Sequence, residues 1–176
     1  MDVSILSTIC IAIICSLVFN YLSKLSKRAP LILNSGDKLL KLPLFYGVTG
    51  IIGFTFGLAI IVYGLIDYDE ENILPQLFIF LFIGGMSAIL ILQQWVIKTI
   101  MTDTELIKIN AFGKERKIKW EEINSVKFNP FTLELKIKSE HCKIKCHYHL
   151  IGFPLLVEKI EQATGMSKAE MGILMA

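Results

Sequence analysis

Three uncharged apolar runs constrain this chain more than any other feature. They cover residues 3–22, 42–66 and 73–97, and none of them contains Asp, Glu, Lys, Arg or His. A bilayer core about 30 Å thick requires about 20 apolar residues of α-helix. We therefore predict three transmembrane helices, the first a retained anchor and the other two a hairpin. The mean hydropathy of +0.58 and the 19% of charged residues agree with a membrane protein.

The basic residues between the runs predict the orientation. Five of them lie between the first and second runs, namely Lys24, Lys27, Arg28, Lys38 and Lys41. The connection over residues 67–72 carries acids and no basic residue. Short cytoplasmic loops are enriched in Lys and Arg. We therefore expect a multi-pass protein of the cell (cytoplasmic) membrane, with an external N-terminus, an external acidic loop and a cytoplasmic C-terminal domain.

Small residues recur along the second and third runs. Gly50, Gly53, Gly57 and Gly64 fall on one helical face, and Gly84 and Ala88 form a similar pair on the next run. Such small-xxx-small spacing lets helix backbones approach closely. We expect these residues to pack the two helices of the hairpin, and homodimerisation through the same face is the alternative.

Beyond residue 101 the apolar residues alternate, as in half-buried strands. The pattern predicts strands over residues 104–110, 115–120, 123–128, 132–138 and 141–148. Gly152-Phe153-Pro154 then begins a helix that Gly165 ends. The predicted fold class is an α+β membrane protein, with three transmembrane helices and a small antiparallel β-barrel or sheet capped by a C-terminal helix.

Parity predicts how the last two strands pair. Placing Ile137 opposite Ile144 also places Leu135 opposite Cys146 on one apolar side. The other side then gathers Lys136, Lys138, Lys143 and Lys145. These four lysines are candidate contacts for an anionic lipid or a partner, and a merely solvated sheet face is the alternative.

Several stretches carry a resemblance to a known family: Thr102-Asp103-Thr104-Glu105-Leu106-Ile107, Phe112-Gly113-Lys114, Ile118-Lys119-Trp120-Glu121-Glu122-Ile123, and Gly152-Phe153 before an amphipathic helix. In these the chain resembles bacterial pleckstrin-homology-like membrane proteins over residues 100–163. The resemblance implies a PH-like fold with a binding or scaffolding role and no reaction. It also implies a helical hairpin inserted after the first strand of the domain. Residues 37–42 would supply that strand here.

These observations predict the following organisation: an anchor over residues 1–23, a cytoplasmic segment over 24–42 with the first PH-like strand, a hairpin over 43–100, a PH-like domain over 101–164 and a tail over 165–176. The tail is expected to be either a short helix or disordered.

Two further clusters invite a functional interpretation. The cysteines Cys142 and Cys146 lie among His141, His147 and His149, which is a metal-ligand composition. Alternation points the cysteines and histidines to opposite faces, so we expect core cysteines, surface histidines and no metal. Lys108, followed by Lys114-Glu115-Arg116, resembles the phosphoinositide-binding signature of some PH domains, so Lys114 and Arg116 are candidate contacts, and a solvated hairpin tip is the alternative.

The sequence shows no arrangement typical of a catalytic triad, a carboxylate pair or a phosphate-binding loop. We therefore expect no enzyme activity and no cofactor. Basic and acidic residues are interleaved in the C-terminal part, so nucleic acid is not an expected partner. The first functional expectation is a membrane-anchored, non-enzymatic module that binds a protein partner or assembles with itself. The alternative is a sensor of anionic lipid headgroups that uses the four lysines.

Overall fold

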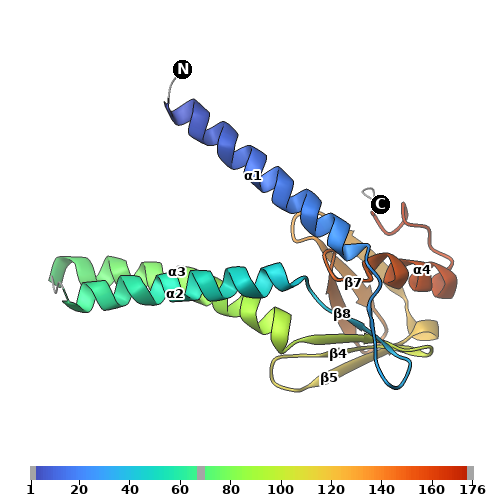
Figure 1. Cartoon of the computed structure of the whole chain (residues 1–176). Helices are drawn as coiled ribbons and strands as arrows, with labels where there is room; N and C mark the ends of the chain where they lie inside the picture. The colour runs from blue at the N-terminus through green and yellow to red at the C-terminus, as the bar shows by residue number, and fades with distance from the viewer. Residues whose placement is uncertain (1–2, 67–69, 174–176) are drawn as a thin grey trace. The chain divides into compact units, whose positions relative to one another are not determined.

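The structure is a computed structural model that describes residues 3–66 and 70–173 (Figure 1). Its elements in chain order are α1 (Val3–Ser26), β1 (Leu31–Ile32), β2 (Lys38–Leu40), α2 (Leu44–Ile66), α3 (Glu70–Trp95), β3 (Lys98–Met101), β4 (Glu105–Ile109), β5 (Glu115–Lys119), the 3₁₀ helix η1 (Trp120–Glu122), β6 (Ser125–Asn129), β7 (Glu134–Lys138), β8 (Lys143–His147) and α4 (Phe153–Thr164).

Three long apolar helices lie where the sequence predicts the three spans. Stretches over Ser7–Ser26, Leu44–Ile66 and Ile73–Trp95 are long and apolar enough to cross a membrane. Helix α1 continues four residues past the predicted end at Leu22, and α3 already begins at Glu70. Residues 67–69 of the predicted acidic loop lie outside the described part of the chain.

The chain forms two compact units. One comprises Met1–Lys41, Thr99–Ile107 and Arg116–Ala176, and we call it the sheet unit. The other comprises Leu42–Lys98 and Lys108–Glu115, and we call it the hairpin unit because it contains α2 and α3. The sheet unit is therefore discontinuous in sequence.

The first sheet has five strands in the order β1-β2-β3-β4-β5. Strand β2 pairs antiparallel with β3, with Leu39 opposite Ile100. The α2–α3 hairpin is thus inserted in the sequence between two strands that are neighbours in the sheet. The expected strand within residues 37–42 exists as β2, but it is the second strand, because β1 precedes it and places Leu31 opposite Leu39.

The second sheet has three antiparallel strands in the order β6-β7-β8. Among the described residues these two sheets do not close into a barrel, so the barrel alternative was wrong and the sheet alternative holds. Trp120 was expected at the end of a strand but begins η1 instead. Its indole Nε1 donates a hydrogen bond to the carbonyl oxygen of Thr102 at 3.1 Å, which holds the ring in the core.

Large apolar side chains fill the core of the sheet unit. Helix α4 contributes four buried residues, and the sheets contribute residues with no exposed surface, namely Leu106, Ile118, Leu135 and Ile137. The tail also joins this core. Met171 is buried, and its carbonyl oxygen accepts a hydrogen bond from the Phe128 amide at 2.8 Å. The described tail through Ile173 therefore packs against the sheet in turns, where a short helix or a disordered end was expected.

The last two turns of α1 dock on the turn between β8 and α4. The Gly152 amide donates a hydrogen bond to the Ser26 carbonyl oxygen at 3.0 Å, and the Phe19 ring contacts the His149 ring at 5.3 Å. Gly152 has φ +87°, and a Cβ there would lie 2.7 Å from Leu40. Only glycine fits both this backbone conformation and this close approach. The helix thus joins the sheet unit through specific contacts.

Candidate functional site

The register of the three-stranded sheet gathers basic residues on one face. Lys136 lies between Lys127 and Lys145 in one row, and Lys138 pairs with Lys143 in another. Directly opposed residues of neighbouring strands share a face, so all five lysines project from the same side. We call this set the lysine face: Lys127, Lys136, Lys138, Lys143 and Lys145. The sequence predicted four of its members and missed Lys127.

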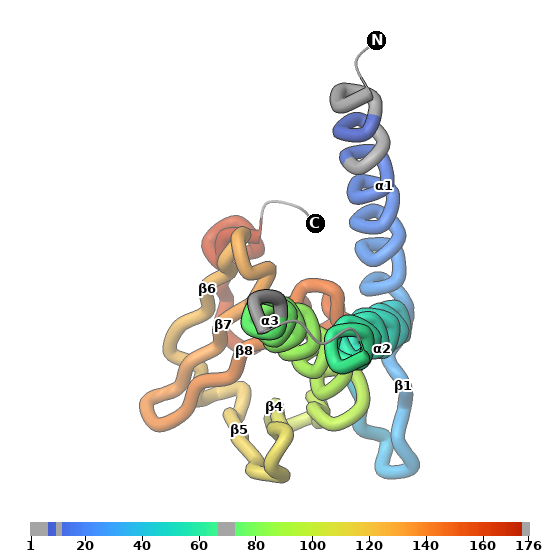
Figure 2. The backbone as a smooth tube through the Cα atoms, turned by 90° about the vertical axis from the view of Figure 1, so that its left-hand side faces the viewer, coloured from blue at the N-terminus to red at the C-terminus, as the bar shows by residue number. Residues whose placement is uncertain are grey.

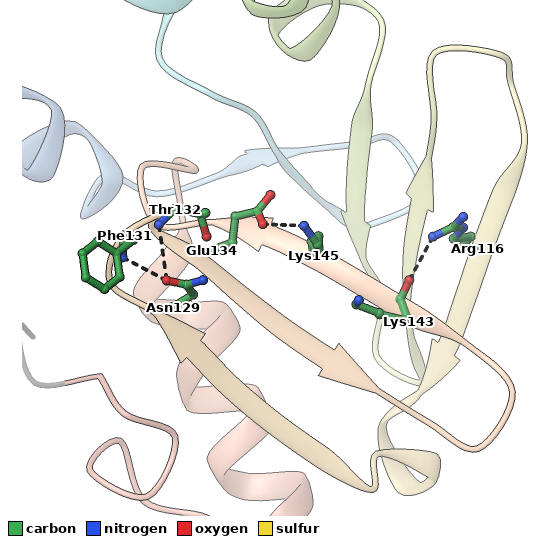
Figure 3. A network of polar contacts seen from close by, with 7 residues as sticks. All are labelled: Arg116, Asn129, Phe131, Thr132, Glu134, Lys143 and Lys145. Carbon is green, nitrogen blue, oxygen red and sulfur yellow. Dashed lines mark hydrogen bonds and ion pairs between the residues drawn. The ribbon is translucent and has the colours of Figure 1, made fainter.

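The opposite face is apolar and buried. Ile137 pairs with Ile144 and Leu135 with Cys146, which confirms the predicted register. The pairing of Val126 with Ile137 extends this apolar face to β6. Figure 3 shows α4 behind the sheet, where its buried side chains help to cover the apolar residues. One-residue alternation thus fixes which face is available to a partner.

The lysine face is electrostatically crowded. The pKa of Lys143 is lowered, first by the charge of Lys136, then by partial desolvation, and then by Lys145 and Lys138. Glu134 is the one acid among the strand residues of this face, and its Oε2 lies 2.7 Å from Nζ of Lys145 (Figure 3). One carboxylate does not balance five ammonium groups. An anionic ligand on this face would relieve the remaining repulsion.

Arg116 adds a guanidinium group at the edge of the lysine face. It lies on β5, and its Nη1 donates a hydrogen bond to the Lys143 carbonyl oxygen at 3.3 Å (Figure 3). Lys114, its predicted companion, belongs to the hairpin unit. There its amide and that of Phe112 donate to Oδ1 of Asn110, which shapes the exposed β4–β5 turn. The sheet unit therefore combines Arg116, and not Lys114, with the lysine face.

An exposed aromatic ring projects from the β6–β7 turn. The Asn129 side chain accepts hydrogen bonds from the amides of Phe131 and Thr132, and Leu133 has φ +51°. This turn leaves Phe131 98% exposed (Figure 3). The sequence pattern gave no sign of this residue, because nothing distinguishes an exposed turn phenylalanine from a buried one without the turn geometry.

The β6–β7 turn lies at the end of the sheet on which α1 docks. The Phe128 ring contacts the Tyr148 ring at 6.0 Å, and the Tyr148 hydroxyl lies 3.5 Å from Oγ of Ser23 on α1. Both overall views place this turn on the side of the sheet toward which α1 extends (Figure 1, Figure 2). The exposed ring and the departing helix therefore share one end of the sheet unit.

The cysteines and histidines do not form a metal cluster among the residues that the structure describes. Cys146 is buried on the apolar face, whereas Cys142 is half-buried in the β7–β8 connection, where its amide donates a hydrogen bond to Oγ of Ser139. The expectation of surface histidines was wrong for His149, which is 2% exposed beneath α1. The alternation that predicted its exposure ends at His147, where the chain turns toward α4.

The predicted helix-packing residues lie between α2 and α3. A Cβ on Gly50 would meet the Ser87 carbonyl oxygen at 2.9 Å, and one on Gly53 would overlap the Ser87 hydroxyl. Gly57 faces Gly84, where a Cβ would lie 3.6 Å from the amide nitrogen. Ala88 lies one turn after Gly84 and is half-buried. Gly47, which the sequence analysis did not single out, makes an equally close approach to Trp95.

Fold and site together define an α+β protein with three long apolar helices, an antiparallel sheet domain with a C-terminal helix, and a basic sheet face. Comparison of the chain with family models, curated proteins and solved structures found no match. The pleckstrin-homology-like resemblance therefore stays a prediction.

Proposed function

We propose that the protein is a membrane-anchored, non-enzymatic module whose sheet unit binds anionic lipid headgroups of the membrane that its helices cross. The observation that carries this proposal is the lysine face, with exposed Phe131 at the end of the sheet where α1 departs. Ammonium groups attract anionic headgroups, and an exposed aromatic ring at a loop tip can insert into the interfacial region of the membrane.

The length of α1 supports a membrane surface close to that end. Leu22, Leu25 and Ser26 are buried, so the final turns of α1 belong to the sheet unit. The remaining helix from Val3 to Tyr21 rises about 28 Å, which matches a hydrocarbon core of about 30 Å. If the bilayer takes up this stretch, its surface falls where the helix meets the sheet.

The excess of Lys and Arg between the first two spans favours a cytoplasmic position for the sheet unit. This orientation is part of the proposal, and it brings the lysine face toward a leaflet that carries anionic lipids.

The two lysine rows lie at different distances from the α1 end of the sheet. Strand geometry places the row of Lys127, Lys136 and Lys145 about 7 Å from the terminal row that contains Glu134. The row of Lys138 and Lys143 lies about 14 Å away. Because the Debye length is about 8 Å at physiological ionic strength, the nearer row contributes more to lipid binding.

A photo-crosslinking experiment on the full chain tests the proposal. The variant Phe131→p-benzoylphenylalanine is placed in nanodiscs of phosphatidylcholine alone or mixed with phosphatidylglycerol, and in native membranes. We expect crosslinks to phospholipid that increase with phosphatidylglycerol and decrease in high salt. Replacing Lys127, Lys136 and Lys145 with Gln should reduce them about 100-fold, at about 1 kcal/mol for each lysine.

A matched triple replacement, Lys38, Lys117 and Lys159 to Gln, removes the same charge outside the lysine face and should leave the crosslinks nearly unchanged. Crosslinks to a protein in native membranes would instead favour the protein-binding or self-assembling module. Crosslinks to neither lipid nor protein, in a chain that retains its fold, would contradict both functions.

A further inference from the structure

A pocket of about 260 Å³ lies within the sheet unit, apart from the lysine face. It is lined by residues from the end of α1, the β8–α4 turn, α4 and the tail: Ser26, Lys27, Tyr148, Phe153, Pro154, Val157, Lys168 and Ile173. The lining comes from the end of α1 and from residues 148–173, which lie more than 100 residues later in the sequence. The pocket is therefore a product of the folded unit and not of a local turn.

The pocket has an apolar floor and a basic rim. Phe153, Val157 and Ile173 are each at least 96% buried and form the apolar part. Lys27 is exposed and Lys168 is half-buried, and both line the same pocket. The nearby hydroxyl of Ser26 already donates a hydrogen bond to the Ser23 carbonyl oxygen at 2.8 Å. The two ammonium groups are thus the cationic groups that the lining offers to a ligand.

The size of the pocket limits what it can hold. A volume of about 260 Å³ accommodates about eight or nine groups of the size of a water molecule. Pockets for drug-sized molecules usually start at about 300 Å³. One short or partly inserted hydrocarbon chain fits this space, whereas the two acyl chains of a phospholipid do not.

The pocket lies at the end of α1, so it would be close to the membrane, which is a source of single hydrocarbon chains. Ser26 is the last residue of α1 and Lys27 follows it, so one wall of the pocket is the end of a helix that is apolar enough to cross a membrane. A molecule that leaves the cytoplasmic leaflet along α1 would meet the pocket directly. This step rests on the proposed membrane crossing of α1 but does not involve the lysine face.

We propose that this pocket binds a single-chain anionic amphiphile, with the hydrocarbon chain against Phe153, Val157 and Ile173 and the anionic head toward Lys27 and Lys168. A fatty acid and a lysophospholipid share this chemistry, one with a carboxylate and the other with a phosphate. Burial of the chain supplies the affinity, and the two ammonium groups select an anionic head. The sheet unit would then respond to a free amphiphile as well as to the membrane surface.

The test uses the full chain in phosphatidylcholine nanodiscs and a ten-carbon fatty acid that carries a terminal diazirine. After irradiation, we expect mass spectrometry to find the label on peptides that contain Phe153, Val157 or Ile173. Unlabelled decanoate and a decyl lysophosphatidylglycerol should compete, and their relative potency distinguishes the two sources of the anionic head. A decyl trimethylammonium salt should not compete.

Charge reversal separates this site from general partitioning into lipid. The double variant K27E/K168E should lose labelling of the pocket peptides about 30-fold or more, whereas the matched control K24E/K159E should retain it. Val157→Phe should reduce labelling by filling the cavity. Labelling confined to the membrane helices, or equal competition by the cationic amphiphile, would overturn the proposal. Neither result depends on the Phe131 crosslinks, so the two proposals can fail separately.

Discussion

The interior of each compact unit is packed with a different kind of residue. In the hairpin unit, the buried residues of α2 are glycines, namely Gly47, Gly50, Gly57 and Gly64, while large side chains such as Ile52 and Phe78 are exposed. In the sheet unit the large residues are inside, and Leu106 and Leu135 have no exposed surface. The same apolar residue types therefore lie outside one unit and inside the other.

The difference reflects the solvent that each unit meets. In water, burial of a large apolar side chain contributes roughly 1.5–3 kcal/mol, so a soluble core gathers leucine and isoleucine. Lipid is as apolar as leucine, so helices that meet in a bilayer gain from close backbone approach instead. Small residues permit that approach. The exposed side chains of α2 and α3 are thus consistent with a lipid environment, and three variants can test this comparison.

The largest effect is expected from truncation of the soluble core. Leu135→Ala removes a side chain without exposed surface beneath the lysine face and should destabilise the sheet unit by about 2–5 kcal/mol. Urea unfolding of the full chain in nanodiscs, followed by the fluorescence of buried Trp120, measures it. The neighbouring Lys136→Ala, on the opposite face, should change stability by about 0.5 kcal/mol or less. Equal effects of the two variants would contradict the assignment of the two faces.

A smaller effect is expected from enlargement of a glycine in the hairpin. Gly50→Leu places a side chain against the Ser87 carbonyl oxygen and the Ile91 amide, two backbone groups that cannot rotate away. Overpacking of this kind costs about 1–3 kcal/mol. Gly50→Leu should push α2 away from α3 and so reduce disulfide crosslinking between cysteines introduced into these two helices. The urea unfolding of the sheet unit should stay unchanged.

The matched control for this variant is Gly85→Leu, because a Cβ on Gly85 meets nothing within 4 Å. It adds the same side chain to the same pair of helices and should leave the crosslinking intact. If Gly85→Leu proved as disruptive as Gly50→Leu, close packing of α2 against α3 would not be what holds the hairpin.

The third effect concerns pH: the stability of the sheet unit should depend on pH, whereas that of the α2–α3 spans should not. Burial, together with the neighbouring His147, lowers the pKa of His149 from 6.5 to about 4. Between these values the unfolded chain binds more protons than the folded one, so the stability present above pH 6.5 falls as the pH approaches 4. The loss should be on the order of 2 kcal/mol. The α2–α3 spans contain no ionisable Asp, Glu, Lys, Arg or His over residues 44–66 and 73–95 and should not respond.

Comparison of urea midpoints at pH 7 and pH 5 tests this expectation. His149→Phe keeps a ring of similar size beneath Phe19 and removes the titrating group, so it should flatten the pH dependence. An unchanged pH profile in this variant would show that other groups cause it.

Short-range periodicity was enough to predict much of the sheet unit. The alternation around Ile137 and Ile144 defines both the register and the lysine side, because a slip by one residue would expose every apolar side chain. The same rule could have found Lys127, since Val126 and Phe128 flank it and face the apolar side.

Features that depend on distant segments were beyond the sequence. Burial of His149 depends on Phe19, which precedes it by more than a hundred residues. The ordered tail depends on a hydrogen bond from Phe128 to Met171. The amphiphile pocket needs the end of α1 together with residues 148–173. None of these contacts leaves a local pattern, because each is formed only when the whole unit folds.

The pairing of β2 with β3 has a consequence for synthesis at the ribosome. About sixty residues, which include both helices of the hairpin, are translated between these two strands. At about 5–20 residues per second, β2 waits roughly 3–12 s for its partner. The sheet cannot be completed until β3 has emerged, so a chain that stalls within the hairpin would keep β2 paired with β1 alone, and quality-control proteases can recognise its open edge. In this protein, completion of the sheet would report that synthesis has passed the α2–α3 hairpin.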